Sequence, residues 1–124
     1  MKKKIEPEYI GSWRIIEMSN WNKKARDRFA LARLTIRPDG LGTLAFYSVQ
    51  AKLDCRMDEV GVAEHLAYKL RGTDEGNEVS GRGWAVAITK NRMEGEFLLH
   101  SGDRSTFQAR RKVKRSAAIA HQGK

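Results

Sequence analysis

Stretches in which apolar and polar residues alternate follow one another along almost the whole chain, with brief turns between them. The clearest covers residues 51–57, where Ala, Leu, Cys and Met alternate with Lys, Asp and Arg. This alternation is typical of a strand that buries one face. The other stretches lie at residues 9–18, 31–37, 41–49, 62–71, 79–89, 93–100 and 105–112. Helices do not alternate with these strands, so a parallel sheet is not indicated.

The connections between the stretches are short. Pro38-Asp39-Gly40 has the residues of a tight turn, and only residues 21–30 predict a helix, with Asn20 as its cap and Trp21, Ala25 and Phe29 on one face. Antiparallel strands joined to their next neighbours close into a barrel without exposed edges. We therefore predict an all-β fold, an eight-stranded antiparallel up-and-down barrel with one short helix between the first two strands. A β-sandwich is the alternative.

The formal net charge of +9 comes from the two ends of the chain. Residues 5–107 contain 15 basic and 15 acidic side chains, which balance. We therefore divide the chain into a basic flexible lead-in (1–8), a β-barrel domain (9–112) and a basic C-terminal tail (113–124). Basic ends can bind the phosphates of nucleic acid or another anionic partner, or they can act only as solvated tails. The candidate contacts are Lys2, Lys3, Lys4, Arg110, Arg111, Lys112, Lys114 and Arg115.

The cysteine content and the hydropathy indicate a reducing compartment. Cys55 is the single cysteine, so an intrachain disulfide is impossible, and no Cys and His residues have the spacing of a metal site. Residues 1–4 are basic like the start of a signal peptide, but no apolar stretch follows them. No apolar run is long enough to span a membrane. We expect a cytoplasmic protein with no metal and no cofactor.

Two resemblances extend these expectations. Gly11-Ser12-Trp13 resembles the Gly-x-Trp signature of lipocalin and calycin barrels, which implies that Trp13 closes the barrel base and that a basic residue, Arg110 or Arg111, lies across it. Residues 10–110 are also similar to a family of small uncharacterised bacterial proteins, a similarity that implies no particular activity. It rests on Leu53-Asp54-Cys55-Arg56, Asp74-Glu75, Ser80-Gly81-Arg82-Gly83-Trp84-Ala85 and His100-x-Gly102-Asp103-x-Ser105-x-Phe107.

Two polar clusters, one in and after the loop predicted at 72–78 and one at 100–105, indicate a candidate site. Alternate connections of an up-and-down barrel share an end, so both loops are expected beside the helix, at the mouth of a lipocalin-like barrel. We expect the following residues to converge there on a ligand: Asp74, Glu75, Arg82, His100, Asp103 and Ser105. The alternative is that they only brace their own turns.

These observations predict a non-catalytic binding or accessory module that recognises a small polar ligand or a partner protein at the barrel mouth. One alternative is a nucleic-acid-associated accessory factor, for example in bacterial or phage defence, that uses the basic termini. Another is a weak hydrolase, because His100, Asp103 and Ser101 or Ser105 are the residue types of a triad, although no nucleophile elbow is present. Most of the following aromatic side chains are expected in the core or lining the barrel: Tyr9, Trp13, Phe46, Tyr47, Tyr68, Trp84, Phe97 and Phe107.

Overall fold

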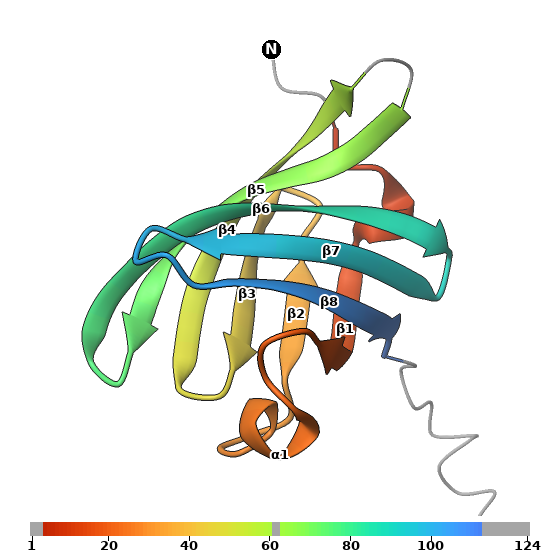
Figure 1. Cartoon of the computed structure of the whole chain (residues 1–124). Helices are drawn as coiled ribbons and strands as arrows, with labels where there is room; N and C mark the ends of the chain where they lie inside the picture. Colours follow the sequence, from red (N-terminus) through yellow and green to blue (C-terminus); the bar gives the residue numbers. More distant parts are fainter. Residues whose placement is uncertain (1–3, 61–62, 113–124) are drawn as a thin grey trace, which may run out of the picture.

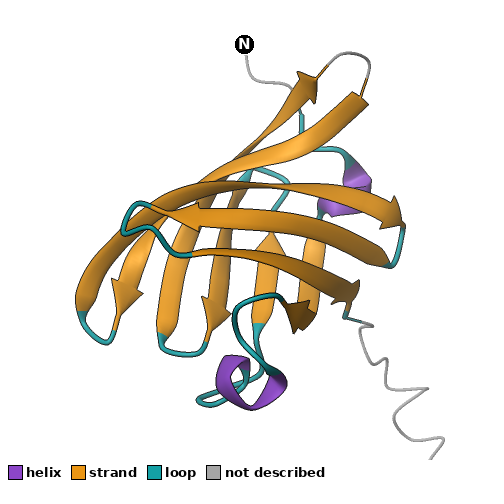
Figure 2. Cartoon of the chain, viewed as in Figure 1, coloured by secondary structure: helices purple, strands orange, loops and turns teal. Residues whose placement is uncertain are grey.

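The computed structural model describes residues 4–60 and 63–112, which form a closed barrel of eight strands in chain order (Figures 1 and 2). Each strand pairs antiparallel with the next, and the last pairs with the first. The up-and-down barrel is confirmed, and the sandwich alternative is wrong. The elements are η1 (Pro7–Tyr9), β1 (Gly11–Met18), α1 (Lys23–Arg26), β2 (Arg33–Ile36), β3 (Leu41–Phe46), β4 (Val49–Val60), β5 (Ala63–Asp74), β6 (Asn77–Thr89), β7 (Arg92–Leu99) and β8 (Arg104–Arg111).

Strands β4 and β5 are longer than the sequence predicted. Residues 58–60, which follow the stretch predicted at 51–57, and most of the loop expected at 72–78 are strand, and Glu75-Gly76 alone connects β5 to β6. Both residues have positive φ, 53° and 85°, as a two-residue hairpin turn with the natural strand twist requires. This turn fixes which residues of β5 and β6 lie opposite each other.

Large side chains fill the barrel, and small residues on β6 make room for them. Alternate residues face inward because strands are pleated, and on β6 the inward positions include Gly81, Gly83 and Ala85. The Tyr68 ring lies over Gly83, and its hydroxyl donates a 2.9 Å hydrogen bond to the Glu96 carbonyl. Burial raises the pKa of Tyr68 well above its ordinary value. The buried aromatic residues of the described part of the chain are Tyr9, Trp13, Phe46, Tyr68, Phe97 and Phe107.

The base of the barrel is closed around Trp13, as the Gly-x-Trp resemblance implies. The Trp13 Nε1 donates to the Tyr9 carbonyl at 3.1 Å, and the Arg111 guanidinium lies 4.4 Å from the indole centroid. Arg111 also donates to the carbonyls of Ile10, Glu8 and Lys90 at 2.6–2.7 Å. Of the two candidates, Arg111 is therefore the residue that lies across Trp13.

Residues just before β1 complete this base. Ile5 and Tyr9 are buried, and the Tyr9 hydroxyl accepts a 3.1 Å hydrogen bond from the Ala87 amide. Burial raises the pKa of Tyr9. Within the lead-in predicted at residues 1–8, Ile5 is therefore packed into the core, as is Tyr9 directly after it.

The helix is much shorter than residues 21–30. It is capped by Asn22, whose side chain accepts a 2.9 Å hydrogen bond from the Ala25 amide, and it ends at Arg26. Arg26 is the buried residue, whereas Phe29 is 63% exposed, so the predicted apolar face is wrong. Neither helical element in the described residues is long and apolar enough to cross a membrane.

Candidate functional site

The β5–β6 and β7–β8 connections both lie at the barrel end that carries α1, as predicted from the topology (Figure 1). Trp21 covers this mouth, since its ring centroid is 4.9 Å from that of Phe46 and 6.0 Å from that of Phe97. An open hollow of about 910 Å³ lies beside Trp21 at this end of the barrel. None of the six predicted site residues lines it; the lining is Trp21, Asn22, Lys24, Ala25, Asp27, Arg28 and Tyr47.

The six predicted residues do not form one cluster at the mouth. The Asp74 carboxylate accepts a hydrogen bond from the Ser48 hydroxyl, which braces the neighbouring turn. Glu75 is an exposed residue of the β5–β6 hairpin turn. Asp103 is also exposed, and its carbonyl accepts a 2.8 Å hydrogen bond from the Leu99 amide. The expected convergence on a single mouth site was therefore wrong.

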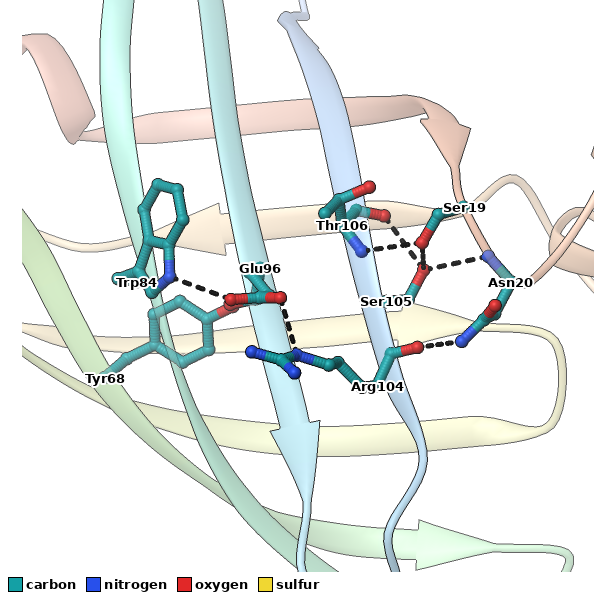
Figure 3. A network of polar contacts seen from close by, with 8 residues as sticks. All are labelled: Ser19, Asn20, Tyr68, Trp84, Glu96, Arg104, Ser105 and Thr106. Atoms are coloured by element: carbon teal, nitrogen blue, oxygen red, sulfur yellow. Dashed lines mark hydrogen bonds and ion pairs between the residues drawn. The ribbon is translucent and has the colours of Figure 1, made fainter.

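Ser105 is buried and joins two segments that are distant in sequence (Figure 3). Its hydroxyl lies 3.3 Å from the Ser19 hydroxyl, accepts from the Asn20 amide at 3.2 Å and donates to the Thr106 carbonyl at 2.9 Å. The Thr106 amide in turn donates to Ser19 at 3.0 Å. These bonds hold the β1–α1 connection against β8, so the Ser105 hydroxyl is already engaged.

Arg82 and His100 lie together on the outside of the barrel. They border a groove of about 580 Å³ on the outer faces of β3 to β6, which we call the outer-wall groove. At its rim the His100 Nδ1 lies 2.9 Å from the Ser80 hydroxyl, and the His100 amide donates to the Ser80 carbonyl at 2.8 Å. The groove is lined by Leu41, Lys52, Leu53, Asp54, Lys69, Leu70, Arg71, Ser80, Gly81, Arg82 and His100.

Four cations of this groove are paired with one another across the strands. Lys52 on β4 lies directly opposite Arg71 on β5, and Lys69 on β5 lies directly opposite Arg82 on β6 and opposite Asp54 on β4. Directly opposed like charges destabilise a sheet. Among the residues that the structure describes, none provides a hydrogen bond or an ion pair to any of these four side chains. With four cations and Asp54 as its one carboxylate, the groove has a positively charged lining.

A smaller depression of about 240 Å³ adjoins the groove at Arg82. On its floor the Trp84 Nε1 donates to the Glu96 carboxylate at 3.2 Å, and the Arg104 Nε donates to the other carboxylate oxygen at 2.8 Å. Trp84 is 41% exposed, so it lies outside the core in which most of the aromatic side chains were expected. The pleat decides this, because Trp84 and Arg82 share the outward face of β6.

The basic residues of the chain ends fall into three groups. Arg111 closes the barrel base. Arg110 and Lys112 are on or beyond β8, Lys112 exposed and Arg110 opposite both Arg14 and Arg92. Lys4 is also exposed. The candidates that lie outside the described residues are Lys2, Lys3, Lys114 and Arg115.

Comparisons with protein-family models, curated proteins and solved structures found no match for this chain. Within residues 4–60 and 63–112, no group of three or more His, Cys, Asp and Glu side chains could hold a metal ion. The outer-wall groove is therefore interpreted from its own geometry, in which opposed cations surround a hollow of small-molecule size.

The opposed cations predict an unusual stability effect. Replacing Lys52 with glutamine should raise the free energy of unfolding by about 0.2–1 kcal/mol at low salt, because it removes the repulsion from Arg71 and the residue on its other side is the uncharged Thr43. Salt at about 0.5 M should shrink the gain through screening. Urea unfolding followed by circular dichroism measures both effects, with Lys23→Gln on α1 as the exposed lysine control. An equal effect of the two variants would contradict the repulsion.

Proposed function

We propose that this protein is a non-catalytic binding module and that its outer-wall groove takes a small anionic ligand carrying phosphate or carboxylate groups. This proposal rests on two pairs of cations that lie opposite each other on neighbouring strands, Lys52 with Arg71 and Lys69 with Arg82. An anion between them offsets a repulsion that the folded barrel otherwise retains. The guanidinium groups can also hold phosphate or carboxylate oxygens through two parallel hydrogen bonds.

The remainder of the groove favours a ligand with an uncharged part. The Ser80–His100 pair at the rim provides hydrogen-bonding groups, and Leu41, 46% exposed, provides an apolar surface. The volume of about 580 Å³ lies within the range of small-molecule sites. These features support a compact ligand with one or two anionic groups.

Two observations favour the outer wall over the barrel mouth as the binding site. At the mouth, Trp21 packs onto Phe46 and Phe97. Arg82 and His100, by contrast, meet in the outer-wall groove. A cytoplasmic location remains part of this proposal, and a single buried cysteine, Cys55, is compatible with it.

Isothermal titration calorimetry with inorganic pyrophosphate tests this function on the full chain. The double variant Lys69→Gln/Arg82→Gln should weaken binding by about tenfold or more, since each tenfold loss corresponds to about 1.4 kcal/mol. The matched control is Lys23→Gln/Lys24→Gln, which removes the same charge from the helix at the mouth. If the two double variants lose the same amount of affinity for pyrophosphate, the anion binds elsewhere or responds only to the net charge of the protein.

A further inference from the structure

We propose that the outer-wall groove serves to bind single-stranded nucleic acid, with backbone phosphates on its cations and a base stacked on Trp84. This inference rests on the proposed anion binding and adds the class of ligand. Proteins that bind single strands combine a basic path for the backbone with exposed aromatic rings for the bases. Arg82 borders both the groove and the depression that contains Trp84, so the two features adjoin.

The basic surface continues beyond the groove on both sides. A further depression of about 390 Å³ shares Lys52 and Arg71 with the groove and adds Arg33 on β2. On the other side, the depression at Trp84 shares Arg82 and adds Arg104 on β8. Three hollows therefore form one path over the barrel wall; each is lined by cations, and the path also contains the carboxylates of Asp54 and Glu96.

The length of this path exceeds the needs of a small anion. Neighbouring strands lie about 4.8 Å apart, so the wall from Lys52 on β4 to Arg104 on β8 measures about 19 Å. One or two phosphates cannot contact cations over that distance, whereas a chain of nucleotides can. The path therefore fits a polymer with regularly spaced negative charges.

Trp84 is placed and held as a stacking surface. Its Nε1 is fixed by the Glu96 carboxylate, which Arg104 also binds, so the indole is ordered before a ligand arrives (Figure 3). The depression beside it, about 240 Å³, has the scale of a single flat group. A single strand offers unstacked bases to such a ring, while a duplex keeps its bases stacked. Single strands are therefore the preferred form.

Fluorescence anisotropy with a labelled oligothymidylate of about 12 nucleotides tests the inference on the full chain. Trp84→Ala should weaken oligonucleotide binding at least about fivefold, the loss expected for one stacked base. Trp84→Phe should restore most of it, and pyrophosphate binding should not change in either variant. Lys69→Gln/Arg82→Gln should weaken both ligands and reduce the slope of log K against log salt by about 1.4, as two lost phosphate contacts predict.

The outcomes separate the inference from the function on which it rests. Pyrophosphate binding without oligonucleotide binding, or without any effect of Trp84→Ala on the oligonucleotide, overturns the nucleic acid and leaves the anion site. If the wild-type protein binds neither pyrophosphate nor the oligonucleotide, the anion site and the nucleic-acid inference are both overturned. If Lys23→Gln/Lys24→Gln weakens oligonucleotide binding as much as Lys69→Gln/Arg82→Gln does, the binding depends on overall charge or on the chain ends, and the inference is overturned. A poly-glutamate peptide that binds as tightly, with the same dependence on Trp84, also overturns the choice of nucleic acid.

Discussion

Replacing Trp13 with alanine is expected to lower the free energy of unfolding by about 3–5 kcal/mol, the usual cost of removing a buried tryptophan. Trp13 is fully buried, donates to the Tyr9 carbonyl and lies under the Arg111 guanidinium. Its loss leaves a cavity at the barrel base and removes the surface on which β8 and the segment before β1 meet. Urea unfolding followed by far-ultraviolet circular dichroism measures the change.

The matched control for this variant is Trp84→Ala. It deletes the same side chain from the outer wall, where the indole is 41% exposed. Partial exposure means that much less apolar area returns to water, so the cost should stay below about 1.5 kcal/mol. Similar costs for the two variants would show that Trp13 does not hold the base together.

Replacing Gly83 with alanine is expected to destabilise the barrel by about 1–3 kcal/mol or more. A Cβ atom there would lie 2.3 Å from the Glu96 carbonyl oxygen and 2.4 Å from the Tyr68 hydroxyl. The carbonyl belongs to the neighbouring strand and cannot move without distorting the β6–β7 pairing. Thermal unfolding measured by circular dichroism detects the loss as a lower Tm.

A second glycine variant separates crowding from a general effect of the substitution. Gly76 has a φ of 85° in the β5–β6 turn, and a Cβ added there meets nothing within 4 Å. Gly76→Asn should cost less than about 1 kcal/mol, because asparagine tolerates positive φ better than other residues do. A Gly83→Ala protein as stable as the wild type would mean that Tyr68 does not pack onto β6 as described.

The sequence alone was sufficient to predict the barrel, because alternation of apolar and polar residues and short connections are local properties. The Gly-x-Trp resemblance also placed Trp13 at the base and reduced its cation partner to two residues, of which the structure selects Arg111. The helix was predicted too long because the Trp21 ring packs onto Phe46 and Phe97, a tertiary contact that local periodicity does not reveal.

The candidate site was only partly accessible from the sequence. Arg82 and His100 were selected for their place in polar clusters, whereas Lys52, Lys69 and Arg71 were missed because each lies in an ordinary strand. Their meeting depends on strand register. A two-residue turn at Glu75-Gly76 sets the register that places Lys69 opposite Arg82. The sequence analysis predicted a longer loop at 72–78, and such a loop does not determine this pairing.

The central claim is that an anion binds on the outer wall of the barrel and not at its mouth. Amide chemical shifts of ¹⁵N-labelled protein, recorded during titration with pyrophosphate, test it most directly. The predicted result is saturable shifts at Lys52, Lys69, Arg71 and Arg82, with little change at Trp21. Shift changes centred on Trp21 and the other residues around the mouth, with no change at the four cations of the outer-wall groove, would contradict the account.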